Sequence, residues 1–156
     1  MKQAKAFSII EVLIVLAIIF IIVGISAYST QNWRKQVNLI NTRDSLKSTL
    51  TKAQQLAASS SQTLSWGVHL ESDRYVFFKG DTYDPDEVSN IITYLKGTQI
   101  INPATSLSDG VSGYSPEVIF AKLSGETVNI GTITITVLND IDSKKEIIIT
   151  KTGAVN

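Results

Sequence analysis

An uncharged apolar run near the N-terminus constrains the fold of this chain more than any other feature. Between Glu11 and Arg34 no residue carries a charge, and the segment from Val12 to Ile25 is apolar except for Gly24. At about 1.5 Å per residue, a helix from Phe7 to Tyr28 would be roughly 33 Å long and would match a hydrocarbon core of about 30 Å. The run therefore predicts a membrane-spanning helix. The residues that mark its length are Phe7, Val12, Leu16, Phe20, Gly24 and Tyr28.

Glu11 stands at the start of this run. An ionised carboxylate at hydrocarbon depth costs on the order of 2.5 to 3.5 kcal/mol even on lenient insertion scales, so such a residue is a functional candidate whose partner should be named. Cleavage of the chain before Phe7 would create an α-amino group one helical turn away, cationic below a reference pKa of about 8. Glu11 could pair with that amine in its own chain or in a neighbouring subunit, and the pair would fix the register between packed helices.

The N-terminal residues resemble the signature of the type IV pilin and pseudopilin superfamily. The stretch KAFSIIEVL, from Lys5 to Leu13, follows a short basic leader of residues 1–6. In that superfamily an inner-membrane prepilin peptidase cuts before a Phe, N-methylates it, and leaves a Glu at the spacing of Glu11. The resemblance implies that Ala6 and Phe7 flank a processing and methylation site, and that Phe7 and Glu11 act in subunit assembly.

The chain departs from the superfamily pattern in two places. Ala6 stands where most members have Gly before the cleavage site, and the residues around Tyr28 include no helix-bending Pro of the kind found in many major pilins. The sequence leaves open how efficiently Ala6 permits cleavage.

A conventional export signal or an uncleaved signal anchor is the alternative interpretation. Lys2 and Lys5 supply a basic start, and the small residues near Gly24 and Ser26 would suit an ordinary signal peptidase. Glu11 argues against this alternative, because nothing in that route needs a carboxylate there. The chain would then be a signal-anchored, β-rich periplasmic or extracellular binding domain that does not polymerise.

The chain length leaves room for one exported domain. Of 156 residues, we assign 1–6 to the leader, 7–28 to the transmembrane and assembly helix, 29–61 to an amphipathic continuation of that helix and 62–156 to a β-rich head. What remains after the span is enough for a single hydrophobic core. The chain has no cysteine, so the fold must depend on packing without disulfides.

The helix is predicted to continue to about Ala58. No Pro or Gly occurs from Gln31 to Thr63, and three serines at 59–61 favour a helix end. The apolar residues that recur on one helical face are Leu39, Leu46, Leu50, Ala53 and Ala57.

The remaining sequence predicts strands. Alternation over residues 64–70 predicts a half-buried strand with Leu64, Trp66, Val68 and Leu70 facing inward, followed by a hairpin partner at Arg74–Lys79. Further strand candidates are Glu117–Leu123, Thr132–Leu138 and Glu146–Thr150.

Two further stretches complete the predicted fold. The run Ile147–Ile149 predicts a central strand covered on both faces, and the polar stretch Asn102–Ser115 predicts an exposed loop. A long N-terminal helix laid over an antiparallel sheet is an α+β arrangement, which is also the fold that the resemblance implies. The first hairpin and the residues Glu146–Gly153 are similar to H-type minor pseudopilins of type II secretion.

No catalytic constellation is apparent, so we expect no enzyme, no cofactor and no small-molecule substrate. His69 is the only histidine, lies on the polar face of its strand and is interpreted as solvated. One histidine without any cysteine supplies too few ligands for the usual zinc sites.

The clustered carboxylates Asp81, Asp84, Asp86 and Glu87 could bind calcium, but their spacing is not that of an EF-hand loop. A solvated turn around Pro85 is the preferred interpretation, and the sequence leaves ion binding open.

The charge balance gives no reason to expect a nucleic-acid partner. The chain has 14 basic and 14 acidic residues, and its C-terminal end, Lys151–Asn156, has one positive side chain. A single phosphate contact supplies little affinity for DNA.

The resemblance implies a structural subunit of a pilus or pseudopilus. Its precursor would cross the inner (cytoplasmic) membrane once, with the leader cytoplasmic and the head periplasmic or extracellular. The implied partners are prepilin peptidase, other pilin or pseudopilin subunits, an inner-membrane assembly platform, and membrane lipid before assembly. The H-type similarity implies a minor subunit, and the sequence does not choose between secretion, pilus and competence systems.

Overall fold

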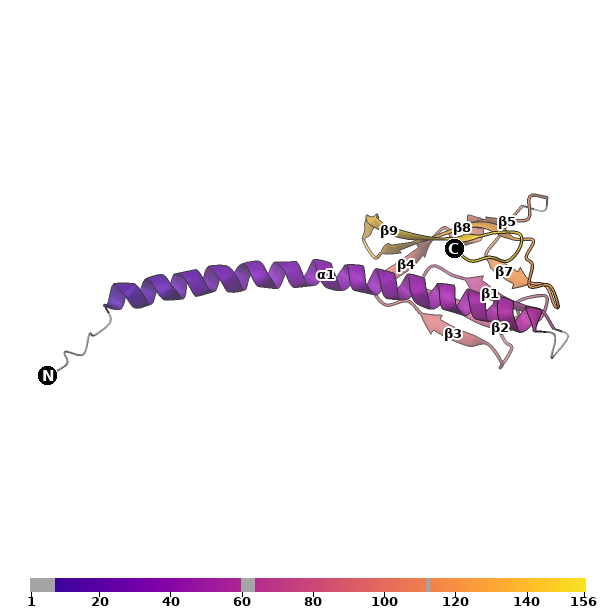
Figure 1. Cartoon of the computed structure of the whole chain (residues 1–156), viewed down its shortest axis with the longest axis horizontal. Coiled ribbons are helices and arrows are strands. Elements are labelled where there is room, and N and C mark those ends of the chain that lie inside the picture. The colour runs from indigo at the N-terminus through magenta and orange to yellow at the C-terminus, as the bar shows by residue number, and fades with distance from the viewer. Residues whose placement is uncertain (1–7, 60–63, 112) are drawn as a thin grey trace. The chain divides into compact units, whose positions relative to one another are not determined.

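The structure is a computed structural model that describes residues 8–59, 64–111 and 113–156; within the helix, the side chains of residues 25–31 are not described. The chain forms two compact units, Met1–Lys35 and Gln36–Asn156. The helix α1, Ile9–Ala58, contributes residues to both units (Figure 1). The prediction of a helix that continues to about Ala58 is confirmed.

The second half of α1 is the central element of the second unit, Gln36–Asn156. This whole unit, which includes the helix residues from Gln36 onward, is called the head from here on. Leu39, Leu46, Leu50, Ala53 and Ala57 are all at most 1% exposed, as their helical spacing predicts. This stripe buries apolar surface against the sheets, which is the main source of stability for a helix in a protein.

The serine that follows α1 closes its last turn. The Ser59 hydroxyl donates to the Leu56 carbonyl oxygen at 3.1 Å, and the Leu123 N–H donates to the Ala57 carbonyl oxygen at 2.8 Å. These bonds satisfy carbonyl groups that the helix itself leaves unpaired.

The first sheet, sheet A, contains β1 (Trp66–Leu70), β2 (Arg74–Lys79), β3 (Ile91–Tyr94) and β7 (Glu117–Phe120). The strands are antiparallel in the order β3-β2-β1-β7. The predicted hairpin of β1 and β2 is confirmed. The inward position of Leu64 is wrong: β1 begins only at Trp66, and Leu64 is 38% exposed.

The second sheet, sheet B, contains β4 (Thr98–Ile101), β5 (Leu107–Ser108), β6 (Tyr114–Ser115), β8 (Ile130–Val137) and β9 (Asp140–Ile149). Its order is β4-β8-β5-β6, and β9 pairs with β8. A short 3-10 helix, η1 (Pro103–Thr105), precedes β5. The strands β3 and β4 were not predicted from the sequence.

Two predictions about sheet B are wrong. The stretch Asn102–Ser115 is not a simple exposed loop, because it contains η1 and the short β5–β6 hairpin, and Leu107 is buried where β5 pairs with β8. The run Ile147–Ile149 is not covered on both faces: Ile147 and Ile149 are buried, but Ile148 is 48% exposed. The reason is that successive side chains of a strand point to opposite faces, so Ile148 lies on the face of sheet B that points away from the core.

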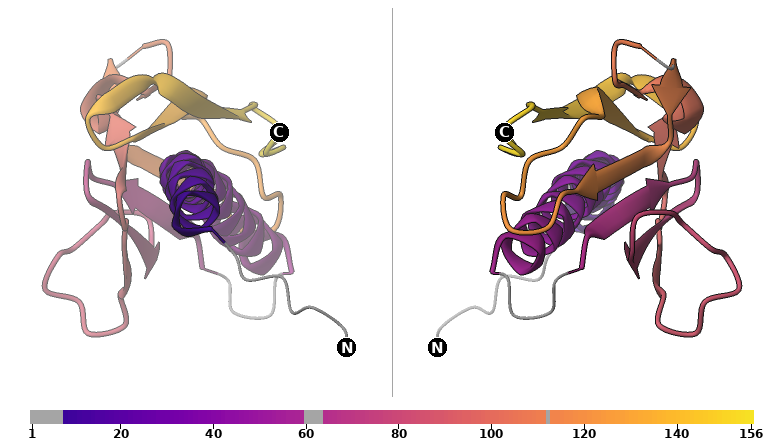
Figure 2. Two further views of the ribbon diagram at one scale, coloured as in Figure 1. Left: turned by 90° about the vertical axis from the view of Figure 1, so that its left-hand side faces the viewer. Right: turned by 90° about the vertical axis from the view of Figure 1, so that its right-hand side faces the viewer.

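One hydrophobic core joins the helix to both sheets. Figure 2 shows sheet A and sheet B lying against the same stretch of α1. The core residues from the sheets are Val68, Leu70, Tyr75, Phe77, Ile100, Leu107, Val118, Phe120, Ile133, Ile135, Val137, Ile147 and Ile149. The molecule is therefore α+β, with a long N-terminal helix packed on antiparallel sheets, as predicted.

Candidate functional site

The N-terminal part of α1 is the candidate functional site. Every large apolar side chain from Ile9 to Val23 is at least 45% exposed, including Val12, Leu16 and Phe20. Soluble monomers rarely expose a continuous apolar surface larger than a few hundred Å², and a helix that is apolar all round is normally buried. This surface therefore needs a covering of lipid or protein.

No helix within the described residues is both long enough and apolar enough to cross a membrane. The predicted span starts at Phe7, which lies outside the described residues together with Ala6, and the side chain of Tyr28 is not described either. Gly24 lies in the described part, where no atom comes within 4 Å of a Cβ built at this position.

Glu11 lies in the first turn of α1. The Glu11 N–H donates to the Ser8 carbonyl oxygen at 3.0 Å, and the Val12 N–H donates to the same oxygen at 3.3 Å. A carboxylate in the first turn is favoured by the positive end of the helix dipole. Over the described residues, no cation lies within ion-pair distance of Glu11.

The spacing of Ser8 and Glu11 also has a local explanation. Ser-x-x-Glu at a helix start is the pattern of a capping box, which is a sequence signal in its own right. A capping role would make Glu11 useful in the isolated subunit, whereas a pairing role needs an amine from outside the described residues. The two roles predict different effects of substitutions at Ser8 and Glu11.

His69 is not solvated, contrary to the prediction. Its side chain is 16% exposed; Nδ1 lies 3.3 Å from Glu117 Oε1, and the ring stacks on Tyr83 at 4.1 Å between centroids. The prediction failed because Tyr83, on the loop after β2, folds back over the outer face of sheet A. Burial raises the pKa of the Tyr83 hydroxyl, and the negative charge of Glu71 adds to this shift.

The acidic loop after β2 forms hydrogen-bonded turns with its four carboxylates exposed. Asp84 Oδ1 accepts from the Asp86 N–H at 3.0 Å, Glu87 Oε1 accepts from the Ser89 N–H at 3.3 Å, and Asn90 Nδ2 donates to the Asp84 carbonyl oxygen at 2.7 Å. In the part of the chain that the structure describes, no three His, Asp or Glu residues are placed to hold a metal ion.

Comparison with known proteins identifies the N-terminal segment. A family model described as the prokaryotic N-terminal methylation motif matches residues 1–27, which include Ala6, Phe7 and Glu11. Neither a curated protein nor a solved structure matches the chain. The match does not extend into the head, so the similarity to H-type minor pseudopilins stays a prediction. The chain therefore carries the N-terminal methylation motif, which supports a pilin-like protein of the kind that prepilin peptidase processes.

Proposed function

We propose that this chain is a minor structural subunit of a type IV pilus or of a type II secretion pseudopilus, assembled through its hydrophobic N-terminal helix. One combination carries the proposal: the methylation motif at residues 1–27 coincides with an exposed apolar helix that has a carboxylate in its first turn. The head contributes a folded outer domain and supplies no catalytic group to the proposal.

In this proposal residues 7–28 hold the precursor in the inner membrane until it is cut between Ala6 and Phe7 and methylated. An assembly platform then moves the subunit from lipid into the fibre, where neighbouring helices cover the same apolar surface. Lipid tails are as apolar as those helices, so the transfer gains little hydrophobic free energy. We therefore assign the register of assembly to a specific polar interaction between subunits.

Glu11 is the group we propose for that interaction. Its carboxylate would pair with the amine of Phe7 in a neighbouring subunit, which neutralises two charges that are costly in apolar surroundings. A subunit placed one step out of register would leave both charges unpaired.

The N-terminus of the exported protein tests processing. We expect intact-mass spectrometry and N-terminal sequencing to find a mature chain that begins at a methylated Phe7. A chain that begins near Ser26, or one that keeps residues 1–6, would contradict the proposal and would support the signal-anchored binding domain instead.

Substitution of Glu11 tests assembly. We expect Glu11→Ala and Glu11→Gln to be inserted and processed but to enter filaments at least about tenfold less than wild type, because neither variant can neutralise the amine. Ser8→Ala is the matched control, since it removes the hydroxyl of the capping box and keeps the carboxylate. Equal loss in Ser8→Ala and Glu11→Ala would show a capping role, and unchanged assembly of Glu11→Ala would contradict the pairing.

A further inference from the structure

We propose that the free edge of β3 and the groove beside it on α1 bind an extended segment of a partner protein that carries a carboxylate. Both features belong to the head, Gln36–Asn156. The inference goes beyond the proposed function, because processing and packing of the N-terminal helix use neither feature.

The backbone of β3 has unused hydrogen-bonding groups. β3 is the terminal strand of sheet A, and Thr93 is paired with Tyr75 of β2. The Leu95 N–H donates to the Asp73 carbonyl oxygen at 2.8 Å, and bonded and non-bonded pairs alternate along an antiparallel ladder. The N–H and C=O groups of Ile92 and Tyr94 therefore point away from β2, and no hydrogen bond to them occurs within the described residues.

The free edges of β7 and β9 are protected. On β7, Asn129 Nδ2 donates to the Glu117 carbonyl oxygen at 2.8 Å. On β9, the Ile148 N–H donates to the Asn156 carbonyl oxygen at 3.1 Å, and the part of the strand nearer its start carries charged side chains that include Lys144. Proteins commonly protect free edges by such charges and coverings.

β3 has no comparable protection. Its four residues carry no charge, and the side chains of Ile92 and Tyr94 are 47% and 60% exposed. A free, uncharged strand edge is the surface to which an extended peptide adds in β-augmentation, with main-chain hydrogen bonds supplying the affinity.

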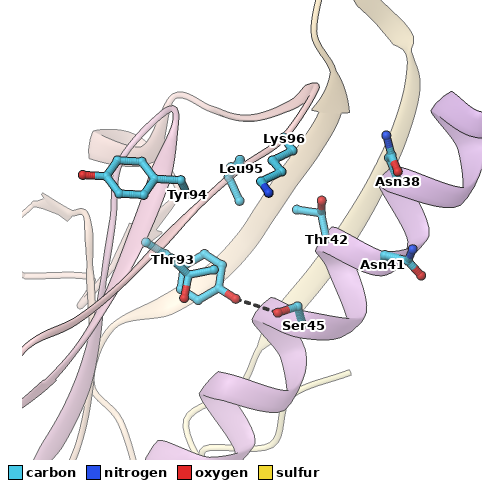
Figure 3. Close-up of a pocket in the computed structure, with 9 residues that line it drawn as sticks. Asn38, Asn41, Thr42, Ser45, Thr93, Tyr94, Leu95 and Lys96 are labelled. Carbon is cyan, nitrogen blue, oxygen red and sulfur yellow. Dashed lines mark hydrogen bonds between the residues drawn. The ribbon is translucent and has the colours of Figure 1, made fainter.

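A groove of about 210 Å³ lies between β3 and α1 (Figure 3). Small-molecule sites usually occupy about 300 to 1,000 Å³, so this groove fits small side chains of a peptide better than a cofactor. Its lining residues are Asn38, Asn41, Thr42, Ser45, Tyr75, Thr93, Tyr94, Leu95 and Lys96.

Two carboxamides on the helix side of the groove have no hydrogen-bond partner among the described residues. Thr42 bonds to Thr98 at 3.0 Å and Ser45 bonds to the Tyr75 hydroxyl at 2.8 Å, but Asn38 and Asn41 are exposed and unbonded. A carboxamide offers both donors and an acceptor, as a peptide backbone does. These side chains can therefore bind polar groups of a segment that lies between α1 and β3.

The charge beside the groove selects an acidic segment. Lys96 is exposed and belongs to no ion pair in the described part of the chain. Arg74, the cation next to Tyr94, is already engaged by Glu71 at 2.9 Å. A carboxylate at the end of the incoming strand would meet Lys96.

The two faces of β3 determine which side chains the partner segment should carry. Tyr75 faces α1, so its pair Thr93 does too, whereas Tyr94 lies on the opposite face beside Arg74. The incoming strand should therefore alternate small polar side chains toward α1 with β-branched apolar side chains beside Ile92 and Tyr94, because successive side chains point to opposite faces.

Two synthetic peptides test the charge preference. The probes are fluorescent, blocked peptides of the sequence Thr-Val-Thr-Val-Thr-Glu and the same peptide ending in Lys, added to the full chain in detergent micelles. By fluorescence anisotropy we expect the acidic peptide to bind at millimolar concentration or below, and the basic one to bind about fivefold more weakly. Lys96→Glu should reverse this preference. Lys122→Glu should not, because Lys122, also an exposed lysine, is on the loop after β7 and does not line the groove.

Tyr94→Pro tests the edge itself. This change removes the outward N–H and spares the hydrogen bonds between β2 and β3, and Pro is tolerated on edge strands with the N–H side facing solvent. We expect it to weaken the acidic peptide roughly tenfold, whereas Tyr94→Phe, which keeps the N–H, should bind as wild type does.

Two results would overturn the proposal: no binding of the acidic peptide at millimolar concentration, or equal binding by wild type and a Tyr94→Pro chain with an unchanged melting temperature. If Tyr94→Pro does not fold, the Lys96→Glu result decides. None of these measurements depends on cleavage or on Glu11, so failure here would leave the proposed function standing.

Discussion

Gly67 shows how one missing side chain shapes sheet A. A Cβ built at Gly67 would collide with Cζ of the Phe78 ring, would lie 2.7 Å from its Cε1, and would lie 3.0 Å from the Val118 carbonyl oxygen. Real Cβ atoms do not approach ring atoms so closely, so the Phe78 ring occupies the space that any larger residue at 67 would need. Phe78 in turn packs against Tyr83, with 5.5 Å between ring centroids.

We expect Gly67→Ala to lower the free energy of unfolding by about 1 to 3 kcal/mol, the usual cost of overpacking a core. Urea denaturation followed by circular dichroism measures the change. Gly24→Ala is the control, because a Cβ there meets no described atom within 4 Å. Equal midpoints for the two variants would show that Phe78 moves aside without cost.

Tyr83 gives the head a dependence on alkaline pH. Burial raises the pKa of its hydroxyl above the ordinary value of about 10, which is the value expected in the unfolded chain. The folded state therefore holds this proton more tightly. Its contribution to stability is fully present below about pH 10 and is lost as the pH rises through the folded pKa.

Tyr83→Phe tests this dependence. The substitution keeps the ring over His69 and removes the titrating group, so we expect a smaller fall in the free energy of unfolding above about pH 10 than in wild type. Denaturant unfolding at a series of alkaline pH values measures it. If both chains lost stability in parallel, Tyr83 would not be the group responsible.

At the scale of elements, the stripe on α1 holds the two sheets together. Leu50 lies on that stripe and is fully buried, whereas Leu56, on the same helix, is 37% exposed. The core contains residues from α1 and from both sheets, so the loss of one of its larger side chains affects the whole head.

We expect Leu50→Ala to cost about 2 to 5 kcal/mol of unfolding free energy, because it removes buried methyl groups and leaves a cavity. Leu56→Ala is the matched control on the same helix, and its effect should be within about 1 kcal/mol. Thermal and urea unfolding of both variants measure the difference. Similar losses would mean that α1 is not anchored through its buried face.

At the scale of the whole molecule, the head is complete without the N-terminal unit. The buried hydrophobic residues of the described chain begin at Leu39, and the two compact units divide between Lys35 and Gln36. The apolar surface that needs a covering lies on the other unit, from Ile9 to Val23.

A chain that begins at Gln36 should therefore fold on its own. We expect it to be monomeric without detergent and to unfold in one cooperative transition, as single domains of this size usually do. Differential scanning calorimetry and sedimentation would measure this. A non-cooperative transition would show that the head needs residues before Gln36.

Features that depend on a local pattern of residues could be predicted before the fold was known. The N-terminal signature is contiguous, the second half of the helix follows from 3.6-residue spacing without Pro or Gly after Gln31, and the β1–β2 hairpin follows from alternation around a short turn. For the same reason the buried face from Leu39 to Ala57 was predictable residue by residue. Glu11 could be singled out from the sequence as a candidate, and its role in assembly stays a prediction, as do the roles of Ala6 and Phe7, which lie outside the described residues.

The neighbours of each strand and the covering of each sheet face depend on how distant segments pack in the folded chain. A run such as Ile147–Ile149 has the same sequence pattern whether both faces of its strand are covered or only one. No residue next to His69 in the sequence indicates that Tyr83 lies over its ring. The free edge of β3 and the groove beside Asn38 and Asn41 exist because segments distant in sequence meet there. Strand order and burial are set by long-range pairing, whose register depends on the whole core rather than on the residues of one strand.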